Sequence, residues 1–318
     1  MASANNILVV GSSNTDMIIK LKRIPRPGET ILGGDFLTAQ GGKGANQAVG
    51  AARAGGHVTF LARLGKDVLG DQALAAFKRD GIDVRHVLRD PAQPSGVALI
   101  FVARDGENSI AVASGANARL SSADVRRAGK AFADAGIVLM QLETPLPAVE
   151  AAARMAADAG AAVILNPAPA RPLSNKLLKL VSILTPNETE AESLTGIKVD
   201  SVSGAARAAA ALRKRGARSV VVTLGARGAF IASEDGEELV AGFKVKVADT
   251  TAAGDIFNGA LAVALAEKKP LRGAVLFANA AAAISVTRMG AQPSAPARAE
   301  IDAWLAAKRV GWNFEGVG

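Results

Sequence analysis

A regular alternation of helix-like and strand-like segments constrains the fold of this chain most strongly. Hydrophobic periodicity predicts helices at 122–134, 147–158 and 203–214, and each precedes an apolar run typical of a buried strand, at 137–142, 162–166 and 219–224. Later strands are expected at 229–232 and 244–247, and helices at 253–267, 271–285 and 298–308. Parallel strands need crossover connections, which are usually helical. The pattern therefore predicts an α/β fold, a three-layer α/β/α sandwich around a mostly parallel sheet.

Two stretches depart from this alternation and predict a second, smaller β-sheet. Short strands are expected at 17–22 and 30–37, and apolar runs at 97–103 and 109–113 flank Asp105-Gly106, a typical hairpin turn. We expect the small sheet to be inserted into the core in two excursions. The expected organisation is a core of residues 1–16, 39–93 and 114–308, a small sheet of residues 17–38 and 94–113, and a C-terminal tail of residues 309–318.

The absence of cysteine and the scarcity of histidine exclude several kinds of active site. With no cysteine and only His57 and His86, the chain has no disulfide, no thiolate nucleophile and no metal centre built on several Cys or His ligands. Acid–base chemistry in such a chain rests on carboxylates or lysine. The lack of cysteine also fits a reducing compartment, and we expect a cytoplasmic location.

The net charge of +8 raises the question of nucleic-acid binding. However, the basic residues are scattered, no basic run is longer than Arg213-Lys214-Arg215, and aromatic residues, which stack on bases, make up only 4% of the chain. We therefore expect no nucleic-acid partner. We expect no membrane partner either, because no signal-peptide pattern opens the chain and its longest uncharged stretch, 273–287, is too short and polar to span a bilayer.

The segment Gly41-Gly42-Lys43-Gly44-Ala45-Asn46 carries the first chemical signal. It precedes a predicted helix, where glycine permits close backbone approach and the helix start offers free N–H groups to an anion. It is not a Walker A loop, because no Ser or Thr follows the lysine where that loop needs one. An ordinary glycine-rich turn would use similar residues, but Lys43 and Asn46 add a cation and an amide.

A second signal lies at 249–260, where a turn of small residues opens a long apolar helix with Asp255 in its first turn. Capping of the helix by Asp255 is the simpler interpretation. However, Ala252, Ala253 and Gly254 leave bare N–H groups beside that carboxylate, an arrangement that suits a developing anion next to a base. Asp255 would accept a proton from a hydroxyl while these amides hold the group being transferred.

Weaker signals follow other predicted strands. The glycine turn at 223–228 fits either a phosphate cradle or a simple strand-to-strand turn. Residues 187–190 open a helix with two acids in its first turn, which alone is ordinary helix capping. Asn14, Asp16 and Glu143 follow strands at the edge where parallel sheets bind ligands, although turn and cap chemistry explains each of them alone.

In this order, the motifs resemble those of the ribokinase-like (PfkB) carbohydrate kinases. GGKGANQA at 41–48 and DTTAAGDIFNGA at 249–260 are similar to the two signatures of that family. NPAPA at 166–170, TPNETEAE at 185–192 and VTRMGAQPS at 286–294 extend the match, and MQLETP at 140–145 makes the chain most similar to the ribokinase group within it. The resemblance implies ATP-dependent phosphorylation of D-ribose at O5, with Mg²⁺ and an activating monovalent cation, K⁺.

The resemblance also implies roles for individual residues. Asp255 matches the general base, and Ala252, Ala253 and Gly254 match the anion hole. The sugar-binding positions are matched by Asn14, Asp16, Gly42, Lys43, Asn46, Glu143 and Asp255. The ATP-contacting positions are matched by Asn187, Thr223, Gly225, Arg227, Gly228 and Asn279. The metal-associated positions are matched by Glu190 for Mg²⁺ and by Asp249, Thr251, Ser285, Arg288, Gly290 and Ser294 for the monovalent cation, with Met289 a departure from the usual basic residue beside that loop. The small sheet resembles the family's lid, which implies a homodimer.

Three alternatives remain. Another kinase of the same family would act on deoxyribose, fructose or a nucleoside, although Asn14 and Glu143 favour a free pentose. A non-catalytic sugar sensor on this fold is disfavoured because Asp255 and Gly254 are intact. A dinucleotide-dependent oxidoreductase is disfavoured because the turn after the first strand, 11–16, lacks the G-x-G-x-x-G fingerprint.

Overall fold

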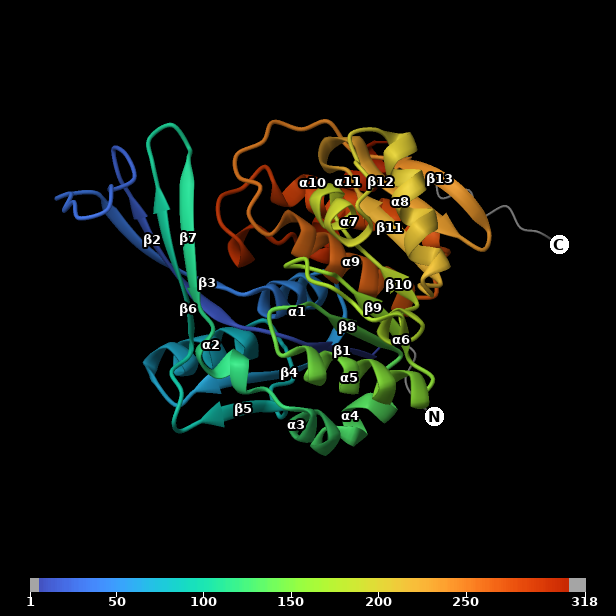
Figure 1. Cartoon of the computed structure of the whole chain (residues 1–318), viewed down its shortest axis with the longest axis horizontal. Coiled ribbons are helices and arrows are strands. Elements are labelled where there is room, and N and C mark those ends of the chain that lie inside the picture. Colours follow the sequence, from blue (N-terminus) through green and yellow to red (C-terminus); the bar gives the residue numbers. More distant parts are fainter. Residues whose placement is uncertain (1–5, 309–318) are drawn as a thin grey trace.

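A computed structural model describes residues 6–308, and within them a nine-stranded sheet forms the centre of the molecule (Figure 1). Its order is β13-β12-β11-β10-β9-β8-β1-β4-β5, and β12 and β13 are its antiparallel members. The strands are β1 (Asn6–Val10), β4 (His57–Gly65), β5 (Val87–Asp90), β8 (Ile137–Met140), β9 (Ala162–Leu165), β10 (Ile183–Leu184), β11 (Ser219–Thr223), β12 (Gly228–Ser233) and β13 (Gly236–Ala241). The central strands are apolar and buried because helices cover both faces.

Helices form the two outer layers, and each layer encloses its own hydrophobic cluster against the sheet. One layer contains α1 (Lys43–Arg53), α2 (Val68–Arg79), α9 (Ala253–Ala266), α10 (Leu271–Ser285) and α11 (Arg298–Ala307). The other contains α3 (Ser122–Arg127), α4 (Gly129–Asp134), α5 (Leu146–Asp158), α6 (Asn175–Leu178), α7 (Glu188–Thr195) and α8 (Val202–Lys214). The three-layer sandwich predicted from the sequence is therefore confirmed. Across residues 6–308, no helix has the length and apolar character needed to cross a membrane.

Helices α1 and α9 pack unusually close, and this contact positions the candidate site. A Cβ atom on Gly259 would lie 2.6 Å from the backbone nitrogen of Ala51, so glycine lets the two backbones touch there. Small residues along both helices allow the same approach over several turns. The first turns of the two helices consequently lie side by side.

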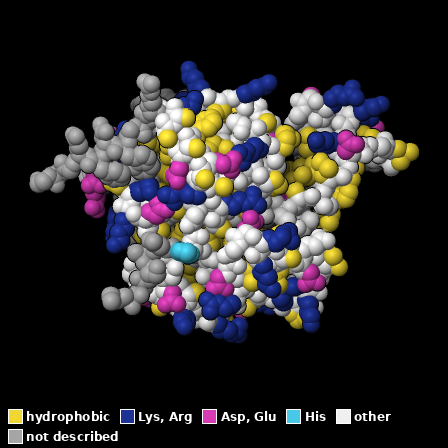
Figure 2. All heavy atoms as spheres, turned by 180° about the vertical axis from the view of Figure 1, so that it is seen from behind, with side chains coloured by type: hydrophobic (Ala, Val, Ile, Leu, Met, Phe, Trp, Pro, Cys, Tyr) yellow, Lys and Arg dark blue, Asp and Glu magenta, His cyan; other side chains and the backbone are white. Residues whose placement is uncertain are grey.

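A second sheet of four strands forms the lid, which projects from the core (Figure 1). Its order is β3-β2-β6-β7, from β2 (Asn14–Lys20), β3 (Asp35–Gly41), β6 (Gly96–Val102) and β7 (Asn108–Ala113). The β6–β7 pair is the hairpin expected around Asp105-Gly106. Hydrophobic side chains gather over this lid, at the right of the view in Figure 2, because a single sheet layer leaves both faces without a covering element.

Several predicted elements are placed differently by the structure. The strand expected at 30–37 corresponds to β3, which begins at Asp35 rather than at residue 30. The strand expected at 17–22 corresponds to β2, whose pairing begins at Asn14 rather than at residue 17. The single helix expected at 122–134 is divided at Ala128, whose backbone (φ −83°, ψ 17°) ends α3. The segment 244–247, expected to be a strand, is not one. The partner of β12 is β13, which the sequence did not predict. Strand β5 was not predicted either. The tail expected at 309–318 lies outside the described residues.

Candidate active site

The carboxylate of Asp255 lies at the centre of the site and is held by two side-chain amides from α1. Asn46 Nδ2 donates to Asp255 Oδ2 and Gln47 Nε2 donates to Asp255 Oδ1, each at 3.0 Å. Asp255 is in the first turn of α9, and the close packing of α1 on α9 brings these residues together from distant parts of the chain. Each carboxylate oxygen keeps a lone pair for a further donor.

Burial raises the pKa of Asp255, because a charge in the protein interior loses its hydration. The charge of Lys43 and the hydrogen bonds from Gln47 and Asn46 act in the opposite direction. In return, Asp255 raises the pKa of Lys43, outweighing the effect of that lysine's own burial. Asp255 is therefore a carboxylate with increased proton affinity, and Lys43, Asn46 and Gln47 stabilise its ionised form.

Polar groups gather beside Asp255 at the carboxyl ends of β1 and β8, in a cluster that we call the polar pocket. Ser12 Oγ and the Lys43 backbone N–H both donate to Glu143 Oε2, at 2.6 and 2.9 Å. Asn14 Oδ1 accepts from Asn117 Nδ2 at 2.8 Å, which leaves the Asn14 amide nitrogen for another partner. Five of the predicted sugar contacts, at Asn14, Asp16, Lys43, Asn46 and Glu143, thus gather around the base, and Gly42 joins them at the start of α1.

Glycine is required where β3 meets this pocket. Gly42 has φ +86°, and a Cβ atom there would lie 2.6 Å from the Asn14 backbone nitrogen. A Cβ on Gly41 would lie 2.3 Å from a carboxylate oxygen of Asp16. Burial, with the charges of Glu143 and Asp255, raises the pKa of Asp16 to about 6. Three carboxyl groups, those of Asp16, Glu143 and Asp255, therefore lie close enough to act on one another electrostatically.

The turn before α9 presents backbone amides next to Asp255. Ala252 adopts a left-handed conformation (φ 59°) as the N-cap residue, which is uncommon outside glycine. The Ala253 N–H donates to the Thr250 carbonyl at 3.2 Å. The N–H groups of Gly254 and Asp255 have no acceptor among the described residues. These free amides at a helix start form a nest suited to an anion.

A cavity of about 710 Å³ opens on the far side of this nest. Ala253 and Gly254 line it, together with five of the predicted ATP contacts: Asn187, Thr223, Gly225, Gly228 and Asn279. Arg227, the sixth, does not line it; its guanidinium pairs with Glu188, which does. Asp255 therefore lies beside the polar pocket, and the two residues before it line a cavity of nucleotide size.

The sequence matches the family of pfkB carbohydrate kinases over residues 4–298. A protein from Haemophilus influenzae named ribokinase is 47% identical over 92% of this chain and 96% of its own length. A Salmonella typhi protein named deoxyribokinase is 36% identical over 94% and 98%. The structure of an Arabidopsis thaliana ribokinase complexed with ribose and ATP superposes with a TM-score of 0.89, at 35% identity, covering 96% of this chain and 99% of that one.

This chain belongs to the pfkB carbohydrate kinases. Its ribokinase-like fold, with the large mixed sheet and the separate four-stranded lid, agrees with that assignment.

Sequence reasoning missed several residues of this kinase site. Phe243, Val247, Phe257 and Val286 form an apolar wall of the large cavity, and Lys244 adds a cation. The alternating Lys244–Val247 run indicated a strand, but it follows the last strand of the sheet and lines the cavity instead. Three further residues support the polar pocket from behind: Asn117, Gln141 and Gln292. Gln141 and Gln292 lie within the motifs at 140–145 and 286–294, but the motifs gave them no role, because their partners are far away along the chain.

The two segments predicted to hold a monovalent cation lie together. Asp249 Oδ2 accepts from the Gly290 N–H at 2.8 Å, and the Ala248 N–H donates to the Val286 carbonyl at 2.7 Å. Burial works to raise the pKa of Asp249, but hydrogen bonds from Thr251 and Gly290 outweigh it and lower the pKa. An ionised carboxylate is the kind of oxygen ligand that a hard cation takes.

The side chains of the other predicted cation residues are engaged elsewhere. The Ser285 and Ser294 hydroxyls donate to the carbonyls of Ala282 and Ala291, at 2.9 and 2.7 Å. The Arg288 guanidinium pairs with Glu300. Ligation from these three positions would therefore come from backbone carbonyls.

Glu190 is the one acid predicted to help place Mg²⁺. Burial raises its pKa, against a hydrogen bond from the Asn187 N–H to its Oε2 at 2.9 Å and the charge of Lys43. Across residues 6–308, no group of three or more His, Asp or Glu side chains could hold a metal ion. A single carboxylate fits Mg²⁺ that keeps several waters and arrives on nucleotide phosphates.

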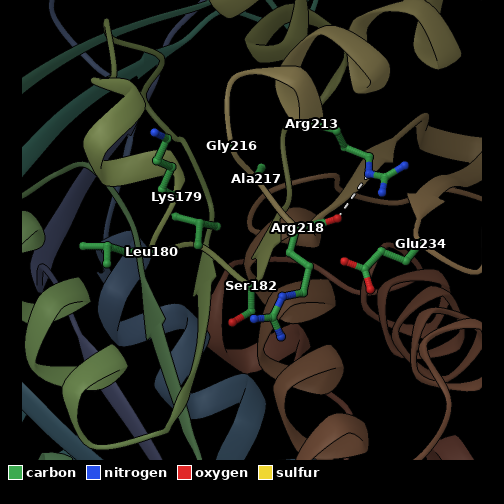
Figure 3. Close-up of a pocket in the computed structure, with 9 residues that line it drawn as sticks. Lys179, Leu180, Ser182, Arg213, Gly216, Ala217, Arg218 and Glu234 are labelled. Atoms are coloured by element: carbon green, nitrogen blue, oxygen red, sulfur yellow. Dashed lines mark hydrogen bonds between the residues drawn. The ribbon is translucent and has the colours of Figure 1, made fainter.

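A separate charged cavity, of about 360 Å³, lies at the amino ends of β10 and β11 (Figure 3). Lys179, Arg213 and Arg218 line it, with Glu234 near Arg218. Figure 3 shows the three cationic groups pointing in different directions, and Arg213 Nε donates to the Arg218 carbonyl at 3.1 Å. Because these cations do not converge, this cavity is a poor phosphate site and lies at the edge of the sheet opposite Asp255.

Proposed function

We propose that this chain transfers the γ-phosphoryl group of ATP to O5 of D-ribose, with Asp255 as the general base. The observation that carries the proposal is the position of Asp255: it lies beside the polar pocket, and Ala253 and Gly254, directly before it, line the nucleotide-sized cavity. A related structure binds ribose and ATP, and the relative from Haemophilus influenzae is named ribokinase. Both support the same substrate pair here.

In this mechanism, Asp255 takes the proton of the sugar's O5 hydroxyl as that oxygen attacks the γ-phosphorus. The bond between the γ-phosphorus and the β–γ bridging oxygen breaks, and ADP leaves. The raised pKa of Asp255 increases its proton affinity, which suits a base acting on an alcohol. The free amides at the start of α9, those of Gly254 and Asp255, stabilise charge on the transferring group, a task that needs positioning rather than covalent catalysis.

Two metal ions complete the proposal. When bound with ATP, Mg²⁺ neutralises phosphate charge, and Glu190 would orient it through water. K⁺ would lie between the 249–251 and 285–294 segments, where it would hold the turn that carries the anion hole. Asp249 would supply the charge, and Thr251, Ser285, Arg288, Gly290 and Ser294 mostly carbonyl oxygens. The residues present fit both ions.

Other substrates of the same family are the main alternative. The deoxyribokinase relative makes 2-deoxyribose a specific rival, since it differs from ribose by one hydroxyl. We favour ribose because the Asn14 amide nitrogen is free to donate, and Asp16 and Glu143 are available to accept from several sugar hydroxyls. A site built to bond a hydroxyl rejects an analogue that lacks it.

A substrate panel tests the proposed function. ADP release would be measured with ribose, 2-deoxyribose, fructose and adenosine, each with and without K⁺. We expect ribose to give the highest kcat/KM and K⁺ to increase the rate. Equal activity on all four compounds would contradict the assignment of ribose as the substrate. A rate independent of every monovalent cation would contradict the roles given to the 249–251 and 285–294 segments.

A homodimer formed through the lid is part of the proposal, since apolar lid residues such as Phe36 and Ile110 are exposed in the single chain. The cytoplasmic location stays a prediction from composition. The expectation of no nucleic-acid partner also stays a prediction; on the face seen in Figure 2, Lys and Arg side chains are interspersed with Asp and Glu.

A further inference from the structure

We propose that Gln141 is a positioning residue for the catalytic base: acting through Gln47, it orients the amide that holds Asp255 Oδ1. The contacts form a chain in which Gln141 Nε2 donates to Gln47 Oε1 at 2.6 Å and Gln47 Nε2 donates to Asp255 Oδ1 at 3.0 Å. Gln141 touches neither of the candidate ligand sites. The proposal rests on the function proposed above, in which Asp255 accepts the sugar proton.

The direction of this chain is dictated by the groups at its ends. An ionised carboxylate only accepts hydrogen bonds, so Gln47 must turn its amide nitrogen toward Asp255. A second branch requires the same orientation: Asn166 Nδ2 donates to the Thr185 carbonyl at 3.0 Å, so Asn166 Oδ1 faces Gln47 Nε2, at 3.1 Å. The oxygen of Gln47 therefore points away from the base, and only a donor satisfies it.

Gln141 supplies that donor, but its own side-chain oxygen is left without a hydrogen bond. Its Oε1 is fully buried and has no hydrogen-bond partner. A buried carbonyl oxygen without a partner is destabilising, and rotating the amide by 180° would place two oxygens together at Gln47. The arrangement thus satisfies Gln47, next to the base, and leaves Gln141 unsatisfied. What distinguishes Gln141 is the donor that it directs to Gln47, the residue that holds the base.

The chain of amides connects four elements of the core. Gln47 is on α1, Gln141 follows β8, Asn166 follows β9 and Asp255 is on α9. All four side chains are buried. Charged groups that act on the pKa values around Asp255 come from the polar pocket and from α7, namely Lys43, Glu143, Asp16 and Glu190. Gln47 and Asn46 are the neutral groups that donate to its carboxylate.

Loss of the Gln141 donor should release Gln47 and weaken its bond to Asp255. Two effects follow. The base moves from its productive position, and a misplacement of about 1 Å costs up to about 10² in rate. The pKa of Asp255 also rises further, because a hydrogen bond that stabilises its ionised form is weakened. The KM for the sugar should not change, since Gln141 contacts none of the predicted sugar-binding side chains.

The test compares Gln141→Met with wild type in steady-state assays with ribose and ATP. Methionine keeps the length of the side chain and removes the donor. We expect kcat to fall about 10- to 100-fold, the KM for ribose to stay unchanged, and the acid limb of the kcat–pH profile to move to higher pH. Gln47→Met, which removes the direct donor, should move the limb in the same direction and further.

Thr144→Val provides the matched control. Thr144 lies in the same segment after β8, is equally buried, and its Oγ1 also has no partner. This variant should keep the wild-type kcat and pH profile. A Gln141→Met profile that keeps its acid limb, or a loss expressed in KM, would overturn the proposal. If Gln141→Met fails to fold, Gln141→Asn replaces it in the test, because asparagine shortens the donor by one methylene. The same changes in kcat, KM and pH profile are then expected.

The same experiments distinguish a failure of the proposed function from a failure of the positioning role of Gln141. A wild-type protein with no ADP release on any sugar, or an Asp255→Ala variant with normal turnover, would remove Asp255 from the chemistry. A wild type that depends on Asp255, together with a Gln141→Met variant of unchanged kcat, would overturn only the positioning role.

Discussion

At the scale of single residues, the balance around Asp255 decides whether the carboxylate works as a base. We predict that Asp255→Ala lowers kcat by about 10²–10⁴, the usual contribution of a positioned general base. Sugar binding should persist, because Asn14, Lys43 and Glu143 keep their positions without it. Single-turnover kinetics and calorimetric titration with ribose would measure the two effects. Near-wild-type turnover in this variant would contradict the mechanism.

Asp16 gives a prediction about pH and stability. Burial raises its pKa in the folded state from the ordinary 3.8 to about 6. Between pH 4 and pH 6 the unfolded chain is therefore ionised at this residue while the folded chain is protonated, so folding stability is lost as the pH rises through that window. Asp16→Asn removes the loss and should stabilise the protein at pH 7 by on the order of 2 kcal/mol.

Urea unfolding of wild type and Asp16→Asn at pH 4 and at pH 7 checks this sign. The two proteins should differ little at pH 4, and the variant should be more stable at pH 7. The gain in stability should be accompanied by a higher KM for the sugar, because Asp16 lies in the polar pocket. A variant that is less stable at both pH values would show that the burial of Asp16 is not the dominant effect.

At the scale of elements, one carboxylate ties the start of α2 to the base of the lid. Asp67 is the N-cap of α2 and accepts from the Gly70 N–H at 2.8 Å. It also accepts from the Ser95 N–H and hydroxyl, both at 2.7 Å, directly before β6. Burial works to raise the pKa of Asp67, but the hydrogen bonds from Ser95 and Gly70 outweigh it and lower the pKa.

We therefore predict that Asp67→Ala destabilises the protein by about 2 kcal/mol, more than the typical cap loss of about 1 kcal/mol. Ser201→Ala is the matched control, since Ser201 caps α8 through the Gly204 N–H at 3.1 Å. The difference between the two variants in urea unfolding at pH 7 measures the connection to the lid. This difference in the free energy of unfolding should narrow as the pH falls through the lowered pKa of Asp67, because protonation of the carboxylate weakens its hydrogen bonds to Ser95 and Gly70. Equal losses in both variants would contradict that connection.

At the scale of elements, the sequence predicted the helices and strands that have a regular apolar spacing. It did not predict the elements and contacts that depend on partners distant in the sequence. Core strands and helices were predicted because their apolar spacing records burial on the sheet. β13 contains Glu237 and Glu238 and is an exposed edge strand, so it shows no such spacing. Gln141 and Asn117 were missed for a similar reason: their roles depend on partners 94 and 103 residues away in sequence, which only the folded chain brings within reach.

At the scale of the whole molecule, the lid is the part that a single chain leaves incomplete. Ile18, Leu37, Ile100 and Ile110 are register partners on one face of the lid sheet, and the Leu37 and Ile110 side chains are about half exposed, at 47% and 56%. A four-stranded sheet needs a covering element on at least one apolar face. A second copy of the lid supplies a surface of the same character.

We accordingly predict that the protein is a dimer in solution and that Ile110→Asp converts it to a monomer. A charge at the centre of an apolar contact loses its hydration without gaining a partner, which costs several kcal/mol. Val68→Asp is the control: Val68 is 68% exposed but lies on α2, outside the lid. Sedimentation velocity at micromolar concentration would separate the outcomes. A monomeric wild type would contradict a dimer formed through the lid, and a dimeric Ile110→Asp variant would place the interface elsewhere.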